Sequence, residues 1–170
     1  MHVYINSPAF GFLRQLAQSP DGYLWGTAQA TDYLENQIID HIFRTASFTK
    51  PTHLYVALFT AAPSDAGGGT EVTGGSYARV DLPPLNANWN ATQGGTTGAS
   101  SGTSGLTANA TAITFPAPTA NWGTVTHFAI MDAITSGNML IWDALTASRT
   151  ILNGDPAPSF AIGALQVTVG

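Results

Sequence analysis

The chain carries little charge and no cysteine. Only 9% of its 170 residues are charged, whereas an ordinary soluble domain has about 25%. Thr, Ser, Asn, Ala and Gly stand in their place, which suits a surface largely occupied by other proteins. Because cysteine is absent, a disulfide framework and thiolate chemistry are excluded. Stability therefore has to come from packing or from assembly.

Positive charge is also scarce, and long apolar runs are missing. The formal net charge is −5, and nucleic-acid binding needs a cluster of basic side chains to neutralise phosphates. No stretch of 18 apolar residues is present, and Arg14 interrupts the N-terminal apolar residues before a signal sequence develops. We expect neither nucleic-acid binding nor membrane insertion. The basic residues are scattered along the chain: Arg14, Arg44, Lys50, Arg79 and Arg149.

The length predicts one domain with appendages. Residues 1–30 are predicted to form an N-terminal arm, with a short strand at residues 2–5, and residues 31–170 a helix plus a β domain. Pro and Gly occur too often in the arm for a long helix or strand to form there. The arm is nevertheless rich in aromatic residues, so it packs either on its own domain or on a neighbouring subunit. The candidate partner-binding residues are Tyr4, Phe10, Phe12, Tyr23, Trp25 and, in a later loop, Trp89.

One long helix is predicted from residue 32 to about residue 45. Asp32 and Glu35 have the spacing of a capping box at its start. Apolar residues then recur every three or four positions, which predicts a single apolar face opposite a solvated one. That apolar face comprises Leu34, Ile38, Ile39, Ile42 and Phe43.

The rest of the chain has the pattern of short strands. Residues 53–60 are apolar at both alternating sets of positions, which predicts a strand buried on both faces. Residues 86–109 form a Gly/Ser/Thr-rich tract, predicted to be a long loop. The fold class is therefore mainly β, an antiparallel β-sandwich or small Greek-key barrel with one amphipathic helix and the arm. Further strands are predicted at residues 77–82, 112–115, 123–132, 139–143, 159–161 and 164–169.

A predicted hairpin offers a candidate polar site. If Gly137 and Asn138 form its two-residue turn, Ser136 pairs with Met139 and Asp132 falls opposite Asp143. Two facing carboxylates bind a cation or share a proton. The alternative, which we favour, is that each aspartate caps nearby backbone amides, because like charges directly opposite destabilise a strand pair.

Other motifs carry little chemistry. Residues 98–102 match the G-x-S-x-G pattern, but the strand and helix that such a nucleophile needs are not predicted around it. The four histidines, at positions 2, 41, 53 and 127, lack zinc-ligand spacing. Trp89, Trp122 and Trp142 form either a sugar-binding platform or packing contacts, and packing is favoured for the last two. We therefore assign no catalytic, cofactor-binding or metal residue.

The order of the motifs resembles a widespread family of tailed-bacteriophage structural proteins, over residues 32 to 170. In the first half the resemblance rests on residues 33–36 (YLEN), 51–60 (PTHLYVALFT), 69–72 (GTEV) and 75–79 (GSYAR). In the second half it rests on residues 113–116 (ITFP), 122–130 (WGTVTHFAI), the turn before Leu140, and residues 160–169.

The resemblance implies a virion component without catalytic activity, assembled in the host cytoplasm. Similar proteins are labelled tail fibre proteins or serve as capsid decoration (cement) proteins. We expect decoration of the head, because one domain without heptads makes a poor fibre shaft. The expected partners are the major capsid protein or other virion proteins and further copies of the chain, as a trimer. The alternatives are a tail fibre or baseplate component, and a carbohydrate-binding module that uses Trp89.

Overall fold

The computed structural model describes residues 29–168. The predicted strand at residues 2–5 and the arm residues Tyr4, Phe10, Phe12, Tyr23 and Trp25 lie outside this range. Residues 29 and 30, predicted to belong to the arm, form the first strand of the described domain. No helix in the described range combines the length and the apolar character needed to cross a bilayer.

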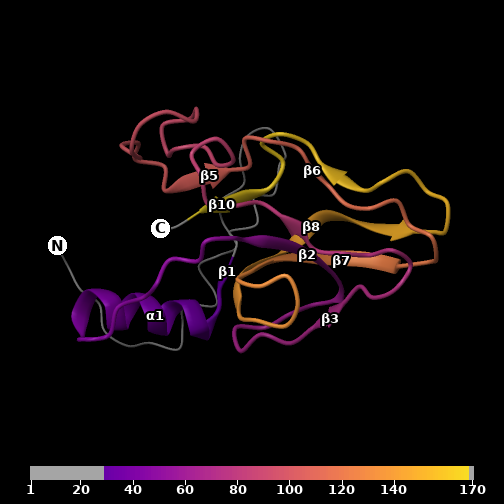
Figure 1. Cartoon of the computed structure of the whole chain (residues 1–170), viewed down its shortest axis with the longest axis horizontal. Helices are drawn as coiled ribbons and strands as arrows, with labels where there is room; N and C mark the ends of the chain where they lie inside the picture. The colour runs from indigo at the N-terminus through magenta and orange to yellow at the C-terminus, as the bar shows by residue number, and fades with distance from the viewer. Residues whose placement is uncertain (1–28, 169–170) are drawn as a thin grey trace.

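Between residues 29 and 168 the chain forms one helix and ten strands, so the fold is mainly β as predicted (Figure 1). All paired strands are antiparallel. The elements are β1 (Gln29–Ala30), α1 (Asp32–Phe43), β2 (Tyr55–Ala61), β3 (Thr70–Glu71), β4 (Val80–Asp81), β5 (Leu106–Ala108), β6 (Ile113–Thr114), β7 (Gly123–Met131), β8 (Met139–Ile151), β9 (Ser159–Phe160) and β10 (Gln166–Thr168).

The strands form one large sheet and two small ones. The large sheet has the order β1-β8-β7-β2-β3, and β4 also pairs with β2. The small sheets are the pairs β5–β10 and β6–β9. Ile113 of β6, Phe160 of β9 and Val167 of β10 pack on the large sheet, so the small sheets lie over one of its faces (Figure 1). Within the described residues the sheets are layered and do not close into a barrel.

The predicted central strand is confirmed. β2 lies between β7 on one side and β3 and β4 on the other, and four consecutive residues from Val56 to Phe59 are buried. Val56 and Leu58 belong to the main core beneath the small sheets. Ala57 and Phe59 belong to a smaller cluster on the opposite face. Apolar residues at both alternating sets of positions thus correctly indicated a strand buried on both faces.

The predicted hairpin exists, but its turn and register differ from the prediction. Met131 of β7 pairs with Met139 of β8, and the loop 132–138 connects them, so Ser136 does not pair with Met139. Asp143 lies opposite Phe128, not opposite Asp132. The facing-carboxylate prediction is therefore wrong, because the loop is longer than two residues. β8 also continues eight residues beyond the predicted end, to Ile151.

The tract 86–109 is a folded loop that contains one strand. β5 lies near the end of the tract. It pairs with β10, with Thr107 opposite Val167 at the centre of the pairing. The exposed tip is held by its own polar groups: Gln93 donates to the carbonyl of Ala99 at 2.9 Å and accepts from the Ser101 amide at 2.8 Å. The loop prediction holds for the tip, whereas β5 was missed.

The helix forms where predicted, but its N-cap is Thr31 and not Asp32. The Thr31 hydroxyl accepts from the Leu34 amide at 3.4 Å and donates to the Met139 carbonyl at 2.5 Å. The Asp32 amide instead donates to the Asp65 carbonyl at 2.8 Å. Thr31 therefore caps the helix and fastens its first turn to the start of β8.

Candidate assembly surface

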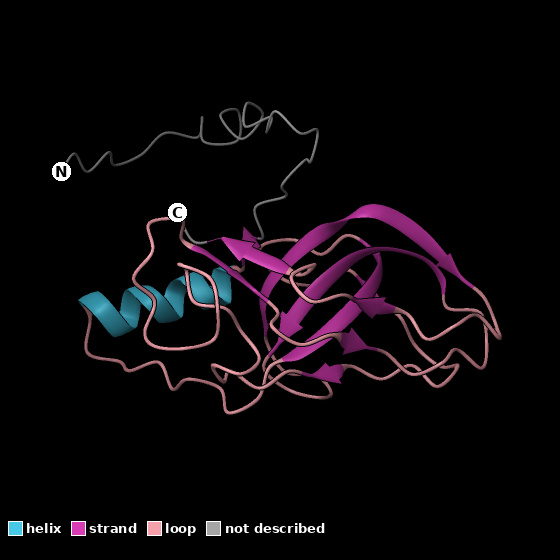
Figure 2. Cartoon of the chain, turned by 90° about the horizontal axis from the view of Figure 1, so that it is seen from above, coloured by secondary structure: helices cyan, strands magenta, loops and turns pink. Residues whose placement is uncertain are grey.

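Helix α1 extends beyond the sheets and is fastened to them at its first turn. The Thr31 amide donates to the Leu140 carbonyl at 3.0 Å, just before the helix begins. Figure 2 shows the helix lying beside the sheets, at one end of the domain, and not across a sheet face. α1 is described in full, and none of its residues is buried. The helix is thus an appendage of the core and not a part of it.

The apolar face of α1 is the exposed one. The exposed fractions are 42% for Ile38, 49% for Ile39, 61% for Ile42 and 78% for Phe43, and we call these four residues the α1 stripe. Gln37, on the opposite side, is half-buried. The pattern that predicted one apolar face is confirmed, but this face points away from the domain. A contiguous exposed patch of large apolar residues is typical of an interaction site.

An apolar pocket of about 380 Å³ lies next to the first turn of α1. Leu34 lines the pocket and stands one helical turn before Ile38, so the pocket and the α1 stripe adjoin. Leu85, another lining residue, is itself 59% exposed. None of the described lining residues is charged. Together the pocket and the stripe make one end of the domain apolar.

Trp89, the only predicted partner-binding residue within the described range, lines this pocket. Its ring is partly buried against the main core. Its Nε1 atom is buried and has no hydrogen-bond partner within residues 29–168. Trp89 is therefore part of a pocket wall and not the flat, open platform that stacks a sugar. Trp122 is buried and donates to the Gly75 carbonyl at 2.9 Å, and Trp142 packs on the smaller cluster, as favoured from the sequence.

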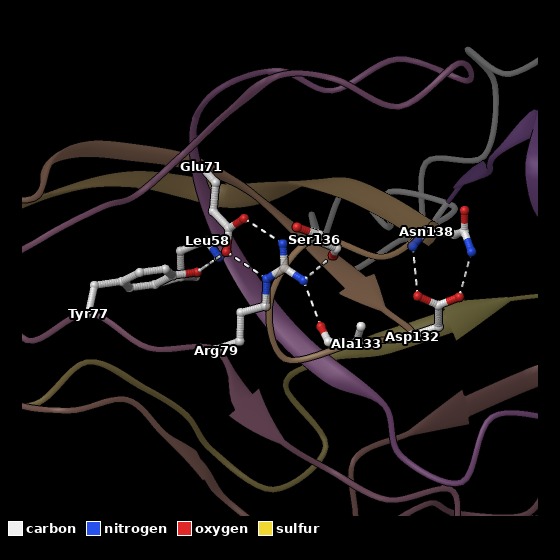
Figure 3. A network of polar contacts seen from close by, with 8 residues as sticks. All are labelled: Leu58, Glu71, Tyr77, Arg79, Asp132, Ala133, Ser136 and Asn138. Carbon is white, nitrogen blue, oxygen red and sulfur yellow. Dashed lines mark hydrogen bonds and ion pairs between the residues drawn. The ribbon is translucent and has the colours of Figure 1, made fainter.

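A polar network joins β3 to the loop 132–138 (Figure 3). Arg79 donates to both carboxylate oxygens of Glu71, at 2.8 and 2.7 Å. Its Nη1 atom donates to the carbonyls of Ala133 and Ser136, at 2.6 and 2.8 Å. The loop 132–138 is therefore tied to β3 through one guanidinium, which suits bidentate recognition of a carboxylate.

Tyr77 completes this network. Its hydroxyl donates to Glu71 at 3.0 Å and accepts from the Leu58 amide at 2.9 Å. Burial is the largest cause that raises the pKa of the Tyr77 phenol, and the nearby Glu71 carboxylate raises it further. The hydrogen bond that Arg79 donates to Glu71 is the largest cause that raises the pKa of Arg79. In both side chains the protonated form is thus favoured.

Asp132 caps the loop, as the favoured alternative predicted. Its two carboxylate oxygens accept from the Asn138 amide at 2.6 Å and from the Asn138 side chain at 2.8 Å (Figure 3). Asp143 accepts from the adjacent Ala144 amide at 2.7 Å, within β8 and not at a strand end as expected. The two carboxylates therefore act separately.

The described histidines have separate environments. His53 contacts Asp81 at 2.8 Å, His41 accepts from the Phe48 amide at 3.1 Å, and His127 lies beside Trp142 with ring centroids 6.0 Å apart. Within residues 29–168, no group of three or more His, Asp or Glu side chains is placed to hold a metal ion. The feature that the structure singles out is therefore the apolar end of the domain.

These features define a class: a small antiparallel β domain that offers a helix with an exposed apolar stripe and an uncharged pocket at one end. The family model described as podophage GP4 fiber I protein gp80 matches residues 29–168. The chain belongs to this family, and it is a structural protein of the tailed-phage virion, in agreement with the resemblance. No curated protein matches the chain.

Proposed function

We propose that the protein is a fibre component of the podophage virion and acts without catalysis. The observation that carries the proposal is the extent of the family match, which runs from β1 to the end of β10. The match therefore covers the whole described domain. This proposal replaces head decoration as the favoured role.

The structure supports an assembly role through its apolar end. The α1 stripe lies on a helix that has no buried residue. When another surface covers the apolar side chains of the stripe, they are removed from water, and this burial stabilises the assembly. We propose that virion proteins, including further copies of this chain, are the partners. The aromatic residues of the segment 1–28 remain candidates for a second contact.

Head decoration remains the alternative role, and the number of copies per particle separates the two. Quantitative mass spectrometry of purified virions would measure this chain relative to the major capsid protein. A fibre component is expected at a few copies per particle, located by antibody labelling at the tail. Hundreds of copies distributed over the head would overturn the fibre proposal in favour of decoration.

A further inference from the structure

We infer that residues 22–28 bind along the outer edge of β8 in the same molecule, as a continuation of β1, and cover a pocket beside that edge. The sheet order places β7 on the inner side of β8 and β1 on its outer side. β1 pairs with β8 at Ile141 and Trp142. Within residues 29–168, no strand pairs with the outer side of residues 144–150, which we call the β8 edge.

The direction of the chain leads the segment 22–28 onto this edge. β1 runs antiparallel to β8, and Gln29 lies opposite Trp142. Each residue before Gln29 therefore falls one position further along β8. In the same register, Leu24 falls opposite Ala147. Because no linker separates the segment from β1, the effective concentration of the segment at the β8 edge is high, which favours it over a separate partner.

The segment and the edge are complementary in size and charge. Residues 22–28 (GYLWGTA) contain no charged residue and no proline, and Tyr, Trp and Thr are residues that favour strands. Pro20 stands just before the segment, where it does not interrupt the strand. Small side chains on one strand leave room for large ones on its neighbour. The small exposed side chains of the β8 edge are Ala144, Thr146, Ala147 and Ser148.

A mainly apolar pocket of about 190 Å³ opens beside the β8 edge. β8 bulges here: Ala144 pairs with His127 and Arg149 with Val125, so four residues of β8 lie opposite one residue of β7. The bulge residues 145–147 line the pocket, together with core residues that include Phe115.

One apolar side chain of the segment fits this pocket. An apolar cavity of about 150 Å³ accommodates benzene, so the pocket is large enough for a single large side chain. Directly opposite residues of paired strands carry their side chains on the same face. Ala147 lines the pocket, and Leu24, opposite Ala147, is therefore the residue that enters it.

This arrangement divides the aromatic residues of the arm into two groups. Tyr23 and Trp25 belong to the chain's own domain, whereas Tyr4, Phe10 and Phe12 remain candidates for contacts with other virion proteins. The added strand also covers backbone groups on which the sheet of another molecule could pair. The β8 edge is thus closed before the domain enters an assembly.

The first test uses the absence of native cysteine. The full chain with Leu24→Cys and Ala147→Cys is oxidised at low concentration and analysed by non-reducing electrophoresis and mass spectrometry. We expect a disulfide within one chain in about half of the molecules or more, because opposite residues of paired strands lie close enough to form one. The matched control combines Leu24→Cys with Ser101→Cys, in the exposed tip of the loop 86–109, and should give about tenfold less. Equal yields in the two variants, or disulfides mainly between chains, would overturn the inference.

The second test measures hydrogen exchange at the amides of residues 144–150 in the full chain. Hydrogen bonds to an added strand protect such amides. The double variant Leu24→Pro/Trp25→Pro removes two donors and the strand geometry around them, so the outward amides should exchange about tenfold faster. The matched control, Ala17→Pro/Gln18→Pro, changes the same arm outside the segment and should leave the rates within about twofold. Equal rates in the two variants contradict the inference. Both tests use the isolated chain, so they are independent of the copy number that tests the fibre role.

Discussion

Replacing Arg79 with methionine removes the guanidinium that joins β3 to the loop 132–138. The Arg79 and Glu71 side chains are only 8% and 23% exposed, so the pair is shielded from water. Breaking a fully buried pair costs about 3–5 kcal/mol, because the remaining charge loses its partner. Glu71 keeps the Tyr77 hydrogen bond and some contact with solvent. We therefore expect Arg79→Met to lower the free energy of unfolding by about 2–4 kcal/mol.

The matched control is the exposed bridge on α1. Arg44 contacts Asp40 at 2.9 Å, but their side chains are 71% and 39% exposed. Exposed pairs at this helical spacing contribute about 0.3–0.5 kcal/mol, so Arg44→Met should change stability little. Both variants are compared with the parent by urea denaturation, with the slope of the transition checked for constancy. Similar losses in the two variants would refute the reasoning that burial gives the Arg79 bridge its value.

Three further substitutions test other residues of the domain. Asn109→Ala should lower the free energy of unfolding, measured by urea denaturation, by about 2–4 kcal/mol. The reason is that buried Asn109 accepts from the Leu165 amide at 2.9 Å and donates to two carbonyls. A loss below about 1 kcal/mol would contradict this. The parent protein should have a higher free energy of unfolding than Tyr77→Phe. Because folding raises the pKa of Tyr77, this difference should be complete below about pH 10 and shrink as the pH rises further. A difference independent of pH would contradict this. Gly69→Ala should destabilise by at least 1 kcal/mol more than Gly68→Ala. Both glycines have φ +79°, but a Cβ on Gly69 would lie 2.9 Å from backbone atoms, whereas nothing lies within 4 Å of one on Gly68. Equal melting temperatures for the two alanine variants would contradict this last expectation.

The elements predicted correctly are those whose residue pattern lies within the element itself. β2 and β7 are runs of apolar and β-branched residues, and both were predicted within a few positions. β5 was missed because its three residues lie in a Gly/Ser-rich tract and are held by β10, near the other end of the sequence. No pattern within the tract indicates that partner.

The errors at the candidate sites have a similar origin. Asp132 and Asp143 were placed opposite each other by assuming a two-residue turn, whereas Arg79, more than fifty residues earlier, holds a longer loop. The periodicity of α1 correctly grouped its apolar residues, but periodicity gives no direction. Whether that face meets the sheets or solvent depends on how Thr31 fastens the first turn to β8.

Because α1 lies outside the core, substitutions in the core and substitutions in the α1 stripe have different first effects. A substitution at Val56 or Phe115 changes the packed interior, so its first effect is on folding. A substitution at Ile42 or Phe43 alters a side chain on which no core residue depends. Related phages can therefore vary this helix to match a changed partner while they retain the same β domain. Within the family, we expect the stripe to drift faster than the strands while remaining apolar.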